Sequence, residues 1–409
     1  MELDVGKLFS QAREKPLLMI PGPTEIPWRV IFAMIQRSYN HHDPKFNVDV
    51  LDATLIKLRK VYQTENEIVA VPGSGRVGLQ AAINSLIECG DKVLCIVAGI
   101  FGGWMREMVQ RVGGEAVEFP VEWGKNIDLK EVEAVLGQGG FKAITVVHNE
   151  TTTGCMYPIK ELGKLAKKYD VLFIVDTVSS LGGADIKTDE WGLDINTAAS
   201  HKCLAAPIGL AILSVSKKAW KVMEGRKAPA TDFAYDVYRW KTMWIPPERG
   251  GDMIFGFRRQ PITMPVHTVF ALREAVDMAL EEGVENRFKR HRIAAKAARE
   301  AVRALGLEMF PEEEIASDTL AAITVPEGVD SRKIIDIVRD RYNIMISAGL
   351  EKLTTGIWRI GHMGMTASPD FILPTLRAFE GALKEVGFLK KVGMGVEAAS
   401  AVFEGENLM

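Results

Sequence analysis

The sequence has few cysteines and no long apolar run. Its four cysteines form no Cys-x-x-Cys pair, so we expect neither a disulfide scaffold nor a metal site. No apolar run reaches the length of a transmembrane helix, and the first residues lack the apolar core of a secretory signal. The last four residues, ENLM, are no peroxisomal address. We therefore expect free thiols, no membrane partner and a cytoplasmic location. The cysteines are Cys89, Cys95, Cys155 and Cys203.

A strong charge of either sign is also missing. The chain has 50 basic and 53 acidic residues and a net charge of -3, which gives no electrostatic reason to expect a nucleic-acid partner. Hydrophobic residues make up 47% and charged residues 25%, as in ordinary globular proteins. A chain of 409 residues can bury a large core, and we expect two subdomains.

Short apolar runs alternate with longer helical patterns over the first half of the chain. The runs are continuous, as in strands of a sheet that is covered on both faces. We therefore predict an α/β fold with a large, doubly wound and mainly parallel sheet. The expected strands are Glu67–Val71, Lys92–Val97, Glu115–Phe119, Ala143–His148, Leu172–Asp176, Ile195–Ala199 and Gly209–Val215. The expected helices are Gly78–Glu88, Trp104–Val112, Leu129–Leu136, Ile159–Tyr169 and Ser179–Gly182.

The pattern changes after about Lys221. Residues 226–265 are rich in Arg, Pro, Trp and Gly, and we expect irregular structure there. The remainder predicts a long helix over Val266–Leu305 with a kink near Gly283, then a strand, a helix and a strand over Leu320–Val325, Ser331–Arg341 and Ile357–Ile360. We therefore predict a large domain over 20–265, a small C-terminal α+β domain over 266–395 and a tail over 396–409. Residues 1–19 are expected to join the small domain or a partner subunit.

An acid and a lysine stand out between Val171 and Ser214. Asp176 closes the apolar run Leu-Phe-Ile-Val, where an unpaired carboxylate is costly and needs a cationic partner. Lys202 lies among Ala, Ser, Cys and Leu, and a desolvated lysine has a depressed pKa that makes its amine a nucleophile. Pyridoxal 5'-phosphate (PLP) needs both, an amine for its aldehyde and an anion for its pyridinium nitrogen. The alternatives are a helix N-cap for Asp176 and a solvated loop for Lys202.

Three loops after predicted strands carry further candidates. Ser74, Gly75 and Arg76 precede an amphipathic helix, where backbone N–H groups and the helix dipole suit a phosphate; a structural glycine turn is the alternative. Phe101, between glycines, suits stacking on a planar ring or packing in the core. Thr151 lies in the polar run HNETTTG, and loops at the carboxyl ends of parallel strands bind ligands. The alternative for Thr151 is a solvated helix cap.

Two more residues complete the candidate set. Val178, two residues after Asp176, suits packing against the face of a ring opposite Phe101. Arg359 lies in the apolar run GIWRIGHMG, where its guanidinium needs an anion; a substrate carboxylate or a structural ion pair would supply one. The glycine turn lacks the Walker lysine and the full GxGxxG spacing, which disfavours a nucleotide site.

Seven motifs, taken in order, resemble those of the class V aminotransferases, a family of PLP enzymes of fold type I. The resemblance is closest to the alanine–glyoxylate and serine–pyruvate aminotransferase branch and covers about Pro21 to Gly364. The motifs are PGPT (Pro21–Thr24), GSGR (Gly73–Arg76), GIFG (Gly99–Gly102), HNETTTG (His148–Gly154), VDTVSSLGG (Val175–Gly183), SHKCLAAPIG (Ser200–Gly209) and WRIG (Trp358–Gly361).

The resemblance implies a PLP-dependent aminotransferase that moves an amino group from a small amino acid, such as alanine or serine, to glyoxylate or pyruvate. Lys202 would form the Schiff base and shuttle the proton, and Asp176 would pair with the pyridinium. The family is homodimeric with shared active sites. The phosphate would be bound by Ser74, Gly75, Arg76 and His201. The ring would be contacted by Phe101, Val178 and Thr151. The substrate would be bound by Gly22 and by Arg359, which would hold its α-carboxylate.

One region departs from the family pattern. Relatives carry a YHxT-type segment that reaches the phosphate in the partner subunit. Here the segment is Gln260–Pro265, its tyrosine is absent and Thr263 is an approximate match. The preceding stretch, Thr231–Arg259, also differs, with two tryptophans and several arginines. These departures leave open an unusual amine as substrate, such as pyridoxamine or an aminophosphonate.

Two other functions remain open. A PLP lyase of the cysteine desulfurase type would need a mobile cysteine nucleophile, and no cysteine follows Cys203. A non-enzymatic or nucleotide-binding α/β protein would leave Lys202 without a chemical role and would bind no chromophore.

Overall fold

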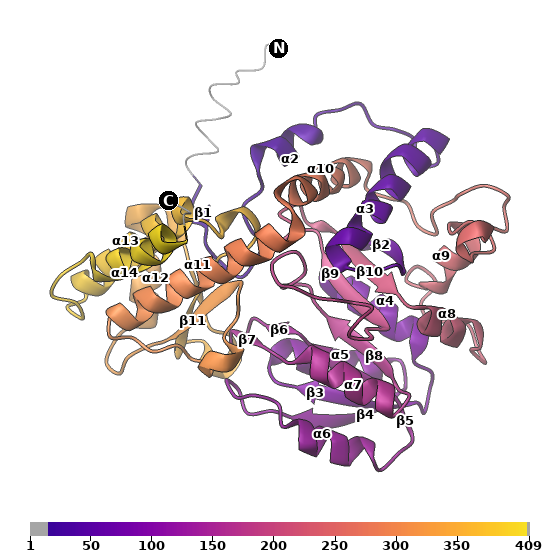
Figure 1. Cartoon of the computed structure of the whole chain (residues 1–409), viewed down its shortest axis with the longest axis horizontal. Helices are drawn as coiled ribbons and strands as arrows, with labels where there is room; N and C mark the ends of the chain where they lie inside the picture. The colour runs from indigo at the N-terminus through magenta and orange to yellow at the C-terminus, as the bar shows by residue number, and fades with distance from the viewer. Residues whose placement is uncertain (1–14, 407–409) are drawn as a thin grey trace.

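The structure is a computed structural model that describes residues 15–406. A seven-stranded sheet forms its centre, in the order β2-β10-β9-β8-β5-β3-β4 (Figure 1). β10 runs antiparallel to β2 and β9, and the other neighbouring pairs are parallel. The predicted α/β fold with a mainly parallel sheet is confirmed. The strands are β2 (Glu67–Gly73), β3 (Lys92–Val97), β4 (Glu115–Pro120), β5 (Phe141–Val147), β8 (Leu172–Asp176), β9 (Ile195–Ala199) and β10 (Gly209–Val215).

Helices cover the sheet because its central strands have no face for solvent. Every residue of β8 and of β9 is buried, as the apolar run Leu-Phe-Ile-Val predicts for β8, and β9 also buries the polar residues Asn196 and Thr197. The N-terminal helices pack on different strands, α4 on β9 and β10, and α5 on β3 and β5. The helices of this part are α2 (Trp28–Ala33), α3 (Ala53–Tyr62), α4 (Gly75–Leu86), α5 (Ile100–Arg111), α6 (Leu129–Leu136), α7 (Ile159–Lys168), α8 (Lys217–Glu224), α9 (Tyr238–Met243) and α10 (Val266–Glu282), with the short helices η1 (Phe46–Asp52) and η2 (Pro247–Arg249).

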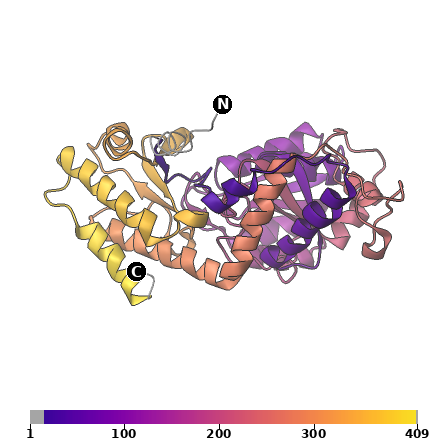
Figure 2. The ribbon, with the colours of Figure 1, turned by 90° about the horizontal axis from the view of Figure 1, so that it is seen from above.

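A second lobe lies beside the first (Figure 2). It has its own hydrophobic cluster around a three-stranded antiparallel sheet, β11-β14-β13. The short strand β1 (Leu17–Leu18) pairs with β12 (Ile344–Met345) and ties the start of the described chain to this lobe. Its other elements are β11 (Leu320–Thr324), β13 (Ser347–Ala348), β14 (Ile357–Gly361), α11 (Val284–Ala304), α12 (Ser331–Tyr342), α13 (Pro369–Glu385), α14 (Met394–Gly405), η3 (Glu313–Ile315), η4 (Glu351–Leu353) and η5 (Gly364–Thr366).

The long helix that the sequence predicts over Val266–Leu305 is two helices joined at Gly283. This glycine has φ +83°, a left-handed conformation that ends α10. α10 packs on α2 and α3 in the first lobe, whereas α11 packs on α14 and β11 in the second. The predicted kink is therefore the point at which the chain passes from one lobe to the other.

Some local predictions differ from the structure. The helix predicted over Ser179–Gly182 is wrong, because Gly182 has φ +81° and the segment closes after a single turn. Residues 226–265 contain the helices α9 and η2 between irregular stretches. The segment expected as a tail from residue 396 belongs largely to α14, which buries Ala399 and Phe403. Residues 1–14 and 407–409, which belong to the expected N-terminal segment and tail, lie outside the part of the chain that the structure describes.

Among residues 15–406, no helix has both the length and the apolar character that a membrane span requires.

Six strands of the large sheet run in the same direction and bring their carboxyl ends to one edge. The polar and glycine-rich segments that the sequence singled out directly follow five of these strands. Such an edge is where open α/β sheets bind their ligands. The five strands are β2, β3, β5, β8 and β9.

Candidate active site

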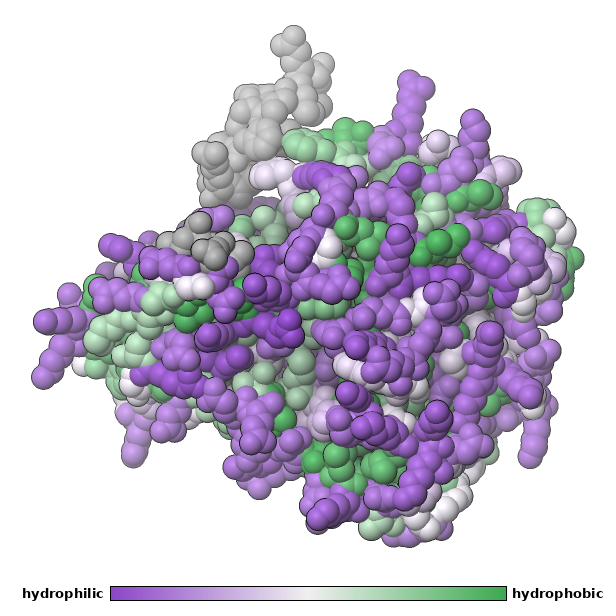
Figure 3. Space-filling view, in the orientation of Figure 1, coloured by the Kyte–Doolittle hydropathy of each residue, from purple (hydrophilic) through white to green (hydrophobic). Residues whose placement is uncertain are grey.

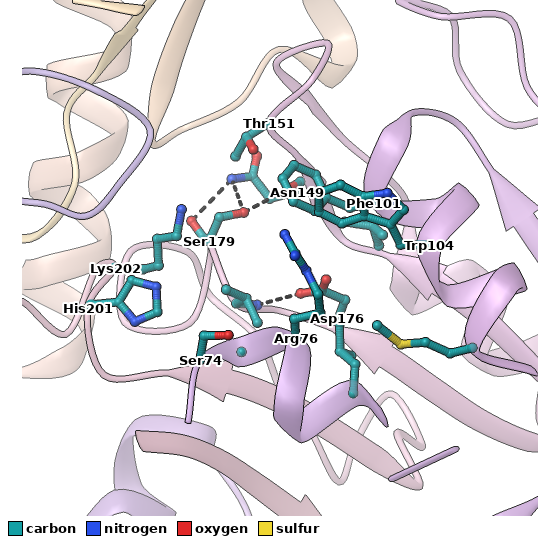
Figure 4. Close-up of a pocket in the computed structure, with 15 residues that line it drawn as sticks. Ser74, Arg76, Phe101, Trp104, Asn149, Thr151, Asp176, Ser179, His201 and Lys202 are labelled. Atoms are coloured by element: carbon teal, nitrogen blue, oxygen red, sulfur yellow. Dashed lines mark hydrogen bonds between the residues drawn. The ribbon is translucent and has the colours of Figure 1, made fainter. Parts of the chain in front are cut away.

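A cavity of about 230 Å³ opens at the carboxyl edge of the large sheet (Figure 4). Each of the loops that follow these five strands contributes side chains to it. The structure therefore brings together nine of the residues singled out from the sequence. They are Ser74, Gly75, Arg76, Phe101, Thr151, Asp176, Val178, His201 and Lys202.

The other three predicted residues do not line this cavity, but two of them contact its walls. Arg359, on β14, donates from Nη1 to the backbone oxygen of Thr151 at 2.8 Å. A Cβ added to Gly22 would lie 2.5 Å from Nζ of Lys202, so the backbone of Gly22 passes directly beside the lysine. Thr263 is exposed, just before α10, and is not part of the cavity of its own chain.

Lys202 follows β9 in a tight turn and extends into the cavity. Removal of water by the surrounding protein lowers the pKa of Lys202 to about 8, although the negative charge of Asp176 opposes the shift. Its Nζ donates a hydrogen bond to the backbone oxygen of Pro21. A large share of this lysine is therefore an uncharged amine at mildly alkaline pH, as a nucleophile or a general base requires.

Asp176 ends β8 with its carboxylate buried under the cavity floor. The side chain is 5% exposed, and its Oδ1 accepts the N–H of Val178 at 2.8 Å. Burial raises the pKa of Asp176 to about 7, against the lowering effect of this hydrogen bond. Within residues 15–406 it forms no ion pair with a cationic side chain. A cationic ligand atom placed here would restore the charged carboxylate.

The first turn of α4, which also lines the cavity, offers an anion site. Ser74 is the N-cap residue, and no hydrogen bond to the helix occupies its side chain. The backbone N–H groups of the first helical residues, Gly75 and Arg76, precede the intrahelical ladder and are free to donate. A Cβ on Gly75 would lie 2.4 Å from Cγ2 of Val178, so glycine is required for this close packing.

His201 adds a neutral imidazole to the same wall. Burial lowers the pKa of His201 to about 4, and the neighbouring Lys202 contributes to the shift. Its Nδ1 is buried without a hydrogen-bond partner. A buried polar atom without a partner is costly, and a ligand that donates to it or accepts from it would remove the cost.

Sequence reasoning missed three polar or aromatic residues of the cavity, Asn149, Ser179 and Trp104. Asn149 donates to the backbone oxygen and the hydroxyl of Ser179 at 3.1 and 3.0 Å (Figure 4), while its Oδ1 is buried without a partner. Asn149 stands in the run HNETTTG, from which only Thr151 received a role. Trp104 lies one helical turn after Phe101, a spacing that places both on one face of α5.

Glu150 fixes the start of α5 to the loop that follows β5. Its carboxylate is fully buried and accepts the N–H groups of Phe101 and Gly102 at 3.1 and 3.3 Å. Burial raises the pKa of Glu150, and these backbone hydrogen bonds counteract the rise. Gly99 leaves room for this contact, because a Cβ there would lie 2.4 Å from Cδ of Glu150. The aromatic wall of the cavity therefore has a rigid base.

Comparison with known proteins identifies the family. The sequence profile of the class V aminotransferases matches residues 20–356. An uncharacterized aminotransferase of Methanocaldococcus jannaschii is 42% identical over 95% of this chain and 97% of its own length. The serine–glyoxylate aminotransferase of Methylorubrum extorquens is 35% identical over 94% and 95% of the two chains. The solved ureidoglycine–glyoxylate aminotransferase of Bacillus subtilis has a TM-score of 0.89 at 30% identity and covers 95% and 98% of the two chains. This chain therefore belongs to the class V aminotransferase family.

Proposed function

We propose that this aminotransferase uses PLP to move an amino group from a small amino acid to glyoxylate or pyruvate. The observation that carries the proposal is the presence, in one cavity, of an amine with a lowered pKa and a buried carboxylate without a cationic partner. These are the side chains of Lys202 and Asp176. They meet the two requirements of PLP at separate atoms, an amine for its aldehyde and an anion for its ring nitrogen.

The remaining walls fit the rest of the cofactor. The phosphate would bind Ser74 and the free N–H groups at the start of α4, which favour an anion. Phe101 and Val178 would enclose the flat ring, and Thr151 with the unpaired Oδ1 of Asn149 would meet its polar substituents. The donor set, the buried charge and the anion site all match the chemistry of PLP.

When bound, the cofactor supplies an electron sink that stabilises negative charge at the substrate α-carbon. Asp176 keeps the ring nitrogen protonated, because its ionised carboxylate is stable only beside a cation. Nζ of Lys202 would take the proton from the α-carbon of the substrate and pass it to C4′, the former aldehyde carbon of PLP. Such general base catalysis contributes about 10²–10⁴-fold.

Arg359 would bind the substrate carboxylate. Its Nε and Nη1 donate to the backbone oxygens of Ala348 and Thr151, each at 2.8 Å, and these bonds fix the plane of the guanidinium. The positive charge of Arg359 also contributes to the lowered pKa of Lys202, so the two side chains are close in space. A carboxylate bound to Arg359 would place the α-carbon within reach of the amine.

The choice of substrates rests on the relatives. Two similar aminotransferases, of Methylorubrum extorquens and Bacillus subtilis, are named for glyoxylate. Alanine and serine are the donors that we propose to test first.

A homodimer is part of the proposal. Hydrophobic side chains lie exposed along the upper edge of the molecule, where α2 lies (Figure 3). They include Trp28, Phe32 and Ile35, the last with 73% exposure. Such a patch suits a protein interface. Exposed Thr263 would then reach the phosphate in the partner subunit.

We also propose a large and a small domain that meet at Gly283 rather than at residue 265. The hydrophobic clusters support this boundary, because α10 belongs to the cluster of the first lobe and α11 to that of the second. The pairing of β1 with β12 joins the start of the described chain to the small domain, and the burial of Ala399 and Phe403 makes α14 part of that domain rather than a separate tail. The four free cysteines support a cytoplasmic location.

Desulfurase chemistry is disfavoured by the state of the cysteines near the cavity. Cys203 and Cys155 are both fully buried. Burial raises the pKa of Cys203 to about 11 and also raises the pKa of Cys155. A desulfurase needs an accessible thiolate, and a thiol of this kind stays protonated.

The test is an absorbance spectrum of the purified protein before and after addition of L-alanine or L-serine. A visible cofactor band that the amino acid abolishes and glyoxylate or pyruvate restores would support the proposal. A band that neither amino acid changes would contradict these donors, and pyridoxamine and an aminophosphonate would be tried next. The Lys202→Ala variant is expected to bind PLP without turnover, whereas Lys160→Ala, on the exposed side of α7, should behave as wild type.

A further inference from the structure

Trp104 contacts two side chains that the proposed function assigns to the cofactor. The guanidinium carbon of Arg76 lies 3.8 Å from the centroid of the Trp104 ring. On another side, the ring of Phe101 meets Trp104 edge to face, with 4.9 Å between centroids and an angle of 87°. Figure 4 shows Arg76 between the two aromatic rings and Asp176. A single indole therefore contacts both the ring-stacking residue and the arginine at the anion site.

The charge of Arg76 is not neutralised by a neighbour. Within the described part of the chain, its guanidinium forms no ion pair and no hydrogen bond and stacks on the ring of Trp104. Stacking occupies the flat face of a guanidinium and leaves its N–H donors free in the plane. Arg76 belongs to the same first turn of α4 as the free backbone N–H groups. The arrangement is suited to a dianion, which would accept from both.

Arg76 also has room to turn away from this site. Arg76, Trp104 and Met108 line a second, outer cavity of about 260 Å³ together with Gln80, Glu107 and Arg111. Without the indole, the long side chain of Arg76 could extend outward toward Glu107 and solvent. The stacking contact therefore selects the inward orientation from several that the space allows.

We propose that Trp104 is a positioning residue that holds Arg76 in the orientation that binds the cofactor phosphate. The inference rests on the proposed function, since it presumes PLP. Trp104 acts through Arg76: the stacked side chain is already ordered, so less conformational freedom is lost when the phosphate binds. A cation stacked on tryptophan in a partly desolvated site gains enough to change affinity by about 5- to 30-fold.

The experiment compares PLP with pyridoxal, which lacks the phosphate. Both dissociation constants are measured by titration of the cofactor-free full-length protein. The dissociation constant of pyridoxal divided by that of PLP reports the phosphate contribution, and this quotient is the ratio used below. Trp104→Leu is expected to lower this ratio by about 5- to 30-fold. Arg76→Met should lower it as well, and adding Trp104→Leu to Arg76→Met should cause no further fall. Both single variants should unfold near the wild-type temperature.

Trp244 offers a matched control. Its ring has an edge-to-face tryptophan neighbour, Trp240, at 5.6 Å and an arginine, Arg258, at 5.8 Å, but it lies away from the cavity. Trp244→Phe should leave the ratio unchanged even where it lowers stability. A fall equal to that of Trp104→Phe would overturn the inference, because loss of aromatic packing alone would then explain both.

The remaining outcomes separate the inference from the proposed function. If Trp104→Leu does not fold, Trp104→Phe is measured, and its smaller ring face should lower the ratio by about 2- to 5-fold. A folded Trp104 variant with the wild-type ratio, or effects of Trp104 and Arg76 that add in full, would overturn the inference alone. A wild-type protein that binds PLP no better than pyridoxal would overturn both the phosphate site and the role of Trp104.

Discussion

A methyl group placed on Gly22 would lie 2.5 Å from Nζ of Lys202. Gly22 has φ +107°, a conformation that side chains rarely adopt, and the residue before it accepts the hydrogen bond of the lysine amine. The PGPT segment therefore meets the amine of Lys202 through its backbone alone. The contact links the segment that follows β1 to the loop of Lys202 in the large lobe.

We expect Gly22→Ala to lower turnover by about 100-fold, because a displacement of about 1 Å at a reacting group has that effect. Gly90→Ala is the control: Gly90 also has a positive φ, +84°, but no atom lies within 4 Å of its added Cβ. Gly90→Ala should lose some stability and keep its activity. Steady-state kinetics and thermal unfolding of the two variants test the prediction, and equal activity in both would contradict it.

The buried amine of Lys202 should destabilise the cofactor-free protein at neutral pH. The folded-state pKa of about 8 is below the unfolded value of about 10.4, so the unfolded chain holds more protons between these pH values and stability rises with pH across that window. Below pH 8 the full penalty applies. Lys202→Met should therefore stabilise the cofactor-free protein at pH 7 by about 1–3 kcal/mol.

The difference between Lys202→Met and wild type should shrink as the pH rises from 8 toward 10.5. Urea unfolding of the cofactor-free proteins at several pH values measures it. Lys160→Met, at an exposed position of α7, should show no such dependence. A difference in stability that is the same at pH 7 and pH 10 would show that the amine is not desolvated.

The large sheet could be predicted because its signals are local and redundant. A continuous apolar run marks β8 within the bounds that the structure gives, the predicted bounds of β9 also match, and glycine or polar residues end the strands at the cavity. Asp176 and Lys202 could be paired from sequence because both follow buried strands of one parallel sheet. Their cavity neighbours follow from the same rule.

Other features depend on contacts between distant segments and left no such signal. The turn at Ser179–Gly182 reads as a helix until the left-handed Gly182 is known. The stacking of Trp104 on Arg76 joins α5 to α4, and each residue alone suits a surface helix. The same holds for Glu282, Arg287 and Arg290, whose charges in the sequence resemble an ordinary solvated helix face.

Glu282 joins two arginines that hold the loops of the active site. Arg287 donates to the backbone oxygens of Gly182 and Cys203, the residue after the lysine. Arg290 donates to the oxygens of Gly364 and Ala367, at 2.8 and 2.9 Å, beyond the strand of Arg359. Glu282 accepts from both arginines at 2.6 to 3.1 Å. The three side chains therefore connect the lysine loop to the small lobe.

Glu282→Gln should destabilise the protein by about 3 kcal/mol, because it leaves two largely buried guanidinium groups without their shared anion. The neighbouring Glu281 is the control, since its side chain is 57% exposed where it pairs with Arg29. Glu281→Gln should change the free energy of unfolding by less than about 1 kcal/mol. Chemical denaturation of both variants measures the difference. Similar losses in the free energy of unfolding would mean that the buried network stabilises the protein no more than the exposed ion pair does.

Asp176 should make cofactor affinity depend on pH. In the cofactor-free protein its pKa is raised to about 7 by burial, whereas beside a cationic ring nitrogen it must be ionised. Binding of PLP below pH 7 therefore releases a proton, and the affinity should fall as the pH is lowered from 7 toward 5. Asp176→Asn should raise the dissociation constant of PLP by about 30-fold or more at pH 8, where the wild-type carboxylate is charged. The variant should also lose this part of the pH dependence.

Asp194→Asn is the matched control, because Asp194 is likewise a buried aspartate with a raised pKa, but it binds Phe173 N–H and Ser216 away from the cavity. Titration with PLP between pH 5 and 8 gives the dissociation constant of the three proteins as a function of pH. We expect the wild-type pH profile in Asp194→Asn and a flatter one in Asp176→Asn. An unchanged profile in Asp176→Asn would contradict the pairing of this carboxylate with the ring nitrogen.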